Sequence, residues 1–121
     1  MDSILTSIKK MLGIAEEYTN FDSDLIMHIN SVFTILTQIG VGPSSCFSII
    51  DEHASWTDFV AEDPRLESIK SYMYLKVKLL FDPPLNSATI ESMNRLISEL
   101  EWRLSVMVDP GDSKEDEMNE E

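Results

Sequence analysis

The sequence contains little of what most enzymes and metal sites are built from. Its 121 residues include one cysteine, two histidines and four glycines. A lone cysteine cannot form an internal disulfide, so the fold does not depend on an oxidising compartment. The four glycines form neither a phosphate-binding glycine loop nor a Gly-Xaa-Ser-Xaa-Gly nucleophile motif.

Long apolar runs and basic residues are also scarce. No segment approaches the roughly 20 apolar residues of a membrane span, and no signal-peptide pattern is visible at the N-terminus. The chain has 9 Lys and Arg against 22 Asp and Glu, a net charge of −13. Because phosphate binding needs clustered Lys and Arg, we do not expect a sequence-specific nucleic-acid binder. We expect a protein made in a cytoplasm and used there, or in a particle assembled there, without a membrane.

The acidic residues are concentrated at the C-terminus. Residues 109–121 carry seven acidic residues and one lysine, or −6, which leaves 15 acidic and 8 basic residues, or −7, for the rest. Such a self-repelling segment buries too little apolar surface to fold alone. The sequence therefore predicts a helical domain over residues 1–105 and an extended acidic tail over residues 106–121.

Apolar residues recur at helical spacing in four segments, residues 3–12, 24–39, 64–81 and about 86–105. Ser3 is a suitable N-cap, and Gly13 and Gly40 are suitable helix ends. Asp63 and Pro64 favour the start of the third helix, and Pro83 favours its end. The buried stripe of the third segment is predicted to be Leu66, Ile69, Met73, Val77 and Leu80. That of the last is predicted to be Ile90, Met93, Ile97, Leu100 and Leu104.

These segments predict an all-α fold, a small helical bundle with a long antiparallel helix hairpin and an extended C-terminal tail. The short link around Pro83 and Pro84 makes the last two helices antiparallel neighbours. Residues 40–63 form a long irregular connection, which often marks a working loop. We expect Ser55 to cap a short helical turn there, and Trp56 and Phe59 to anchor the loop to the helices.

Few residues are candidates for chemistry. The separations of His28, Cys46 and His53 match no zinc pattern, and Cys46 is expected to be a buried, inert thiol. A divalent ion at Asp51, Glu52 and His53 competes with a solvated cluster, which is the favoured interpretation. We assign no catalytic residue, no cofactor and no metal.

Aromatic residues suggest contacts between subunits. Tyr72, Tyr74 and Trp102 lie off the main apolar stripes, and aromatic residues with one polar end are common at interfaces. The alternative is a broad core that covers most of the third long helix. If these aromatic residues form contacts between subunits, Tyr72, Tyr74 and Trp102 touch neighbouring copies.

Four segments resemble the tailed-phage head–tail connector (adaptor) family. They are Trp56–Phe59, residues 69–84 with the pattern YxYLKVxLLFDPP, residues 90–93, and residues 99–104 with the sequence ELEWRL. The resemblance covers about residues 4–108. It implies a helical, non-enzymatic protein without a cofactor, located in the virion neck at the head–tail junction.

The resemblance also implies partners. Members of the family form a ring, usually of twelve copies, under the portal protein, continue the DNA channel, and seat a stopper or tail-completion protein. Acidic walls suit a channel through which double-stranded DNA passes without being bound, because repulsion acts over about 8–10 Å at physiological salt. The family's C-terminal segment docks on the portal, so we expect Val106, Met107 and Val108 to contact it as a short extended strand. A solvated C-terminal end is the alternative.

A competing hypothesis is a small acidic interaction protein, such as a DNA mimic or a host-directed inhibitor. It accounts for the charge and size of the chain. It requires neither the helix hairpin nor two apolar faces, and it predicts no assembly with a portal.

Overall fold

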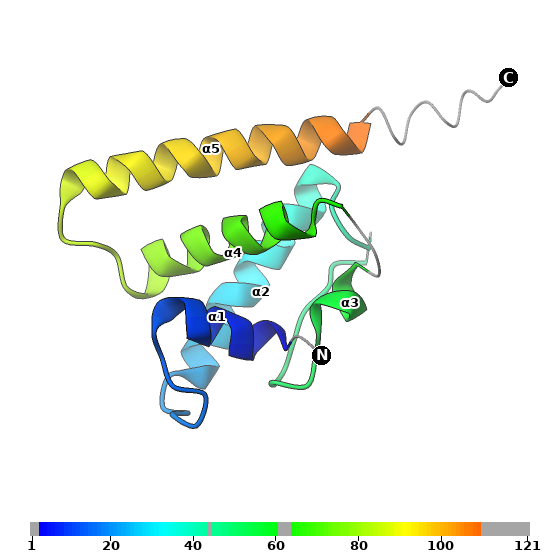
Figure 1. Ribbon diagram of the computed structural model, residues 1–121. Helices are drawn as coiled ribbons and strands as arrows, with labels where there is room; N and C mark the ends of the chain where they lie inside the picture. Colours follow the sequence, from blue (N-terminus) through cyan, green and yellow to red (C-terminus); the bar gives the residue numbers. More distant parts are fainter. Residues whose placement is uncertain (1–2, 44, 61–63, 110–121) are drawn as a thin grey trace, which may run out of the picture.

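The computed structural model describes residues 3–43, 45–60 and 64–109, and these form five helices. The helices are α1 (Ile4–Leu12), α2 (Asp22–Ile39), α3 (Trp56–Phe59), α4 (Leu66–Phe81) and α5 (Ser87–Asp109). Helix α4 contacts α1, α2 and α5, and α5 runs antiparallel to it (Figure 1). The described residues contain no strand, only an isolated bridge between Ser3 and Ser55. The predicted all-α bundle with its hairpin is confirmed.

Helix boundaries follow local chemistry. The Ser3 hydroxyl accepts the Thr6 amide at 3.1 Å and begins α1. Gly13 and Gly40 end α1 and α2 in the left-handed conformation, at φ 82° and 101°. The Asn86 side chain accepts the amides of Ala88 and Thr89 at the start of α5.

The buried residues of α2 lie at helical spacing and are Leu25, Ile29, Val32, Phe33 and Leu36. The predicted stripe of α5 is buried at Met93, Ile97 and Leu104 and partly buried at Ile90 and Leu100. The buried face of α4 differs from its predicted stripe. Ile69, Met73 and Val77 are buried, but Leu80 is 53% exposed. Leu80 lies on the predicted face in the last turn of α4, where that face is no longer covered. Helix α4 begins at Leu66, and Pro64 precedes it in a turn. The predicted cap Asp63 lies outside the described residues.

Tyr72 belongs to the core rather than to the surface. Its side chain is fully buried, and its hydroxyl donates to Glu101 Oε2 at 2.7 Å. Helix α4 is covered by three helices, so its buried arc is wider than one stripe and includes this position. Burial raises the pKa of Tyr72 above its usual range, and the hydrogen bond to Glu101 raises it further.

One charged side chain is also buried. Lys9 is 2% exposed, and its ammonium donates to the Glu16 carbonyl at 2.9 Å and lies 2.9 Å from the Asp22 carboxylate. These contacts join α1 to the connection that follows it and to the first turn of α2. Pairing and hydrogen bonding offset the cost of taking this charge out of water.

The loop between α2 and α4 is fixed to the helices. Asn30 binds the backbone of Ile49 twice, accepting its amide at 2.8 Å and donating to its carbonyl at 3.0 Å. The Trp56 indole donates to Ser7 at 2.9 Å, and the Phe59 ring lies 4.7 Å from that of Phe33. Residues 47–50 belong to no helix or strand. The loop therefore contributes to the core, with Val41 and Ile49 buried.

Met73→Ala should lower the free energy of unfolding by about 2–4 kcal/mol, because it removes a buried side chain and leaves a cavity. The matched change Leu80→Ala, on the same helix but half exposed, should cost less than about 1 kcal/mol. Urea denaturation measures both. Equal losses from the two substitutions would contradict the burial described for α4.

Tyr72→Phe should cost about 1–2 kcal/mol at pH 7, because a hydrogen bond to a carboxylate is lost. A tyrosine pKa raised in the folded state stabilises the protein fully below the unfolded pKa of about 10, and this contribution declines as the pH rises above it. Urea denaturation from pH 7 to 11 should therefore show the difference shrinking above about pH 10. Tyr74→Phe is the control. A difference in unfolding free energy between wild type and Tyr72→Phe that does not change with pH would contradict this prediction.

Candidate functional site

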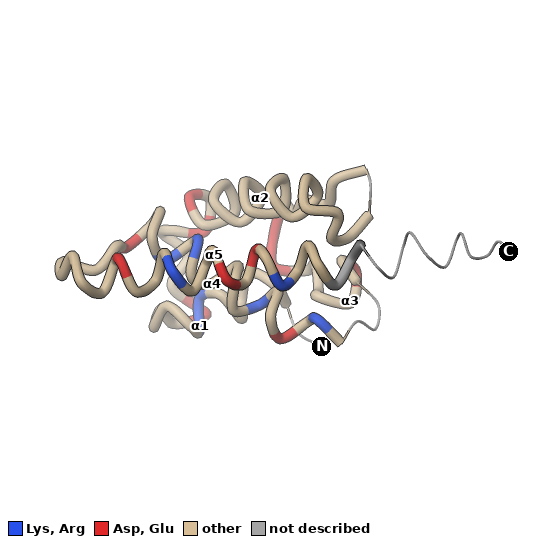
Figure 2. The backbone as a smooth tube through the Cα atoms, turned by 90° about the horizontal axis from the view of Figure 1, so that it is seen from above, with Lys and Arg blue, Asp and Glu red and all other residues tan. Residues whose placement is uncertain are grey.

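Helix α5 is the most exposed long element, and its two flanks differ. Seen from above, α2 lies on one side of α5 and α1 on the other, with α4 beneath (Figure 2). Met93, Ile97 and Leu104 face the core. Each flank of α5 thus borders a different neighbour, and each border is hollowed.

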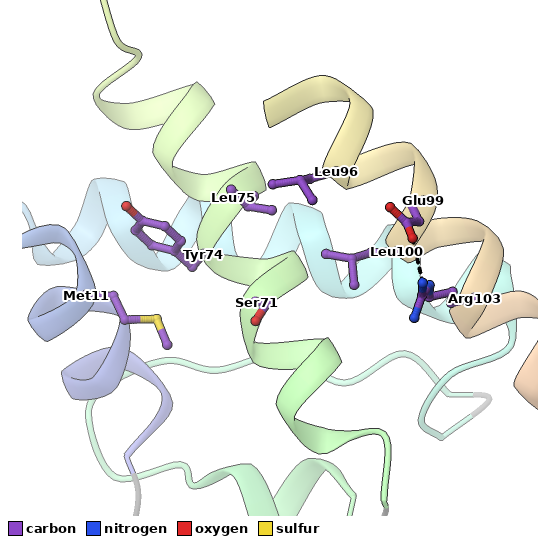
Figure 3. A pocket seen from close by; sticks show the side chains of 8 residues that line it. All are labelled: Met11, Ser71, Tyr74, Leu75, Leu96, Glu99, Leu100 and Arg103. Atoms are coloured by element: carbon purple, nitrogen blue, oxygen red, sulfur yellow. Dashed lines mark hydrogen bonds and ion pairs between the residues drawn. The ribbon is translucent and has the colours of Figure 1, made fainter. Parts of the chain in front are cut away.

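The first hollow is a groove between α1, α4 and α5, with a volume of about 720 Å³ (Figure 3). We name it the α1–α4–α5 groove, and its lining residues are Met11, Ser71, Tyr74, Leu75, Leu96, Glu99, Leu100 and Arg103. Met11 is 43% exposed and Leu96 50%. Glu99 and Arg103 form an ion pair at 2.6 Å along one edge. The groove is thus mainly apolar, with charges on the α5 side.

The second hollow lies between α2 and α5, with a volume of about 460 Å³. We name its surface the α2 flank, and its lining residues are Ile35, Gln38, Ile39, Ser98, Glu101, Trp102 and Ser105. Trp102 is 66% exposed. Glu101 is the one charged residue in this lining, and it accepts the Tyr72 hydroxyl.

The α2 side of the molecule is uncharged over a long distance. Residues 25–50 contain no Asp, Glu, Lys or Arg, and Figure 2 shows charges on α2 only near its start. Large apolar side chains are exposed there, including Met27 at 58% and Ile50 at 85%. In a chain with a net charge of −13, this is where two copies can approach with least repulsion.

The predicted subunit-contact residues do not share one surface. Tyr72 is fully buried, so its assignment as a surface contact is corrected. Tyr74 is half buried in the wall of the α1–α4–α5 groove, whereas Trp102 projects from the α2 flank. Sequence analysis overlooked Met11 and Leu96, and also the charge-free run of residues 25–50, which was readable in the sequence.

The predicted loop anchors and tail contacts have definite positions. Trp56 and Phe59 are 1% and 4% exposed and hold the loop against α1 and α2. Helix α5 continues to Asp109, so residues 106–108 are helical rather than extended, and the boundary set at residue 105 falls inside this helix. Val106 is 40% exposed. The side chains of Met107 and Val108, and residues 110–121, lie outside the described part of the chain.

Two features at first considered for chemistry are exposed. Asp51, Glu52 and His53 place ligand atoms within 4.8 Å of one another. The hydrogen bond from the backbone of His53 lowers the pKa of Asp51, and the side-chain bond to Asp51 raises that of His53. Exposed acidic groups of this kind are common without a bound ion. Cys46 is exposed, not buried as expected, and its backbone has a positive φ of 70°.

Comparison with known proteins gives one match. A family model described as phage connector protein matches residues 4–111, nearly the whole chain. Searches of curated proteins and of solved structures give no match. Within the described residues, no helix is long and apolar enough to cross a membrane. The family match assigns a structural role and a place at the neck of the phage particle. The chain therefore belongs to the phage connector protein family.

Proposed function

We propose that this chain is one subunit of a ring that joins the portal to the tail of a phage and continues the DNA channel. The observation that carries this proposal is the family match over residues 4–111. The ring contains about twelve copies, the number that the family resemblance implies. The chain acts by assembly and not by catalysis.

Contact between copies involves Trp102 and Tyr74. Trp102 offers a large, exposed apolar surface with one hydrogen-bond donor, the type of residue that dominates binding at interfaces. Ile35, Gln38 and Ile39, which belong to the uncharged run of residues 25–50, line the same hollow as Trp102. Burying these side chains between copies supplies stability that a single 121-residue domain lacks.

The two ends of the ring contact different proteins. The last turn of α5, with Val106, Met107 and Val108, binds the portal together with the acidic tail. Residues 106–108 are helical in the free chain, so the last turn of α5 must unwind if they bind the portal as an extended strand. The loop between α2 and α4 presents Ile50, which is 85% exposed, to the stopper or tail-completion protein.

The ring passes double-stranded DNA without holding it. A net charge of −13 on each subunit repels phosphate groups, and the repulsion extends over about a Debye length of 8–10 Å. The duplex is thereby kept off the wall of the channel. The same charge is compatible with a small acidic inhibitor, which would remain monomeric and would not bind a portal.

Trp102→Ala should abolish or weaken ring formation by about 2–4 kcal/mol per interface while leaving monomer stability within about 0.5 kcal/mol. Native mass spectrometry of the chain, alone and with purified portal, measures assembly, and thermal melting measures stability. Leu85→Ala, which removes a fully exposed apolar side chain from the link between α4 and α5, is the control. Wild-type chain that remains monomeric even with the portal would refute the ring.

Val106→Asp should weaken portal binding at least about ten-fold, whereas truncation after Asp109 should retain most of it, because the apolar last turn of α5 supplies the contact. Co-sedimentation with purified portal at low and high salt measures both, and Leu85→Asp controls for the added charge. Binding that is lost on truncation after Asp109, and is sensitive to salt, would assign the contact to the acidic tail instead.

A further inference from the structure

The two flanks of α5 present different side chains to solvent. Leu96, Glu99, Leu100 and Arg103 follow the i, i+3, i+4, i+7 spacing of one helix side and border the α1–α4–α5 groove. Ser98, Trp102 and Ser105 follow the i, i+4, i+7 spacing of another side and border α2. One flank is therefore an open, mainly apolar groove, and the other carries an indole that is 66% exposed.

A closed ring of many copies requires this type of asymmetry. Its interfaces are heterologous, which means that each copy uses one patch towards the copy ahead and a different patch towards the copy behind. The two patches must be complementary and must lie on different sides of the subunit. Helices α2 and α1 lie on opposite sides of α5 (Figure 2), and the α2 flank borders the first while the groove borders the second, which meets this requirement.

The groove also matches an indole chemically. Met11, Leu75, Leu96 and Leu100 provide an apolar surface for the rings. Ser71 and Glu99 offer acceptors for the single N–H donor of the indole. The guanidinium of Arg103 at the edge can lie against its face, which adds a cation–π attraction.

The dimensions and charges are compatible as well. A groove of about 720 Å³ admits a tryptophan side chain with room for neighbouring atoms. The α2 side of the docking surface contains no charged residue, since residues 25–50 have none. The one carboxylate in the lining of the α2 flank is that of Glu101, which accepts the Tyr72 hydroxyl of its own copy. The α2 flank also contains Ile35 and Ile39, apolar side chains that match Met11 and Leu96 in the lining of the groove.

We propose that Trp102 of each copy inserts into the α1–α4–α5 groove of the next copy, head to tail. This inference rests on the proposed ring and specifies its subunit contact. It makes Trp102 and the groove two halves of one interface, so loss of either half stops assembly. A copy with only Trp102 intact and a copy with only the groove intact can still form a single contact with each other.

The test uses two variants that each remove one half. Trp102→Ala lacks the indole, and Ser71→Trp fills the groove from within, since Ser71 is an exposed position in its wall. Leu96→Asp is a second groove variant, should Ser71→Trp disturb the fold. Ser23→Trp adds the same side chain at an exposed position in the first turn of α2, outside the groove, and is the control.

Native mass spectrometry of each chain alone and of the two mixed, with and without portal, gives the answer. We expect rings from wild type and from Ser23→Trp, at least a ten-fold higher assembly concentration for each groove or Trp102 variant, and one-to-one heterodimers from the mixture. Rings from a groove variant, or a mixture that stays monomeric while wild type forms rings, would overturn the head-to-tail contact and leave the proposed function standing. Wild type that never assembles would overturn the proposed function itself.

Discussion

Burial of α4 among three other helices is the constraint on which the rest of the structure depends. Ile69, Tyr72, Met73 and Val77 face α1, α2 and α5 and are almost completely removed from water. Each such side chain contributes about 1.5–3 kcal/mol of transfer free energy, so a small domain has little stability without them. With α4 in the centre, α5 is covered on one side only. Its two flanks remain free for other contacts.

The irregular parts of the chain are held by a few polar contacts to this centre. Asn30 fixes the backbone at Ile49, and the Trp56 indole reaches Ser7 on α1. Both contacts satisfy groups that would otherwise be buried without a partner, which is costly. They also orient the uncharged loop residues beside α2. The surface that we propose for assembly is therefore built on a rigid base.

Much of the fold was predictable from the sequence, because local rules decide it. The α2 stripe, the Ser3 cap and the Gly13 end depend on residues within one or two turns of each other. Leu80 and Tyr72 were misassigned for the opposite reason. The spacing of apolar residues indicates which face of a helix is buried. It does not indicate how many neighbouring helices cover that face, or how far along the helix they extend.

The candidate site was less predictable, for a similar physical reason. Met11 and Leu96 come from helices far apart in sequence, and only the packing of α1 beside α4 and α5 brings them to one groove. Trp102 was recognisable as a side chain off its stripe. The end of α5 was not recognisable in the sequence. The acidic composition after residue 108 suggested that the chain becomes extended earlier, whereas the helix continues to Asp109.

Charge and shape together support an assembling subunit. The chain has a net charge of −13, but residues 25–50 carry no charged side chain. Acidic surfaces of two copies repel each other, whereas the uncharged surfaces can come into contact. The most direct test is a cryo-electron microscopy map of the neck of purified particles of the phage that encodes this chain. The account predicts a closed ring beneath the portal, into each subunit of which helices α1–α5 fit with Trp102 facing the adjacent copy. Particles that lack the chain, or hold it without ring symmetry, would contradict it.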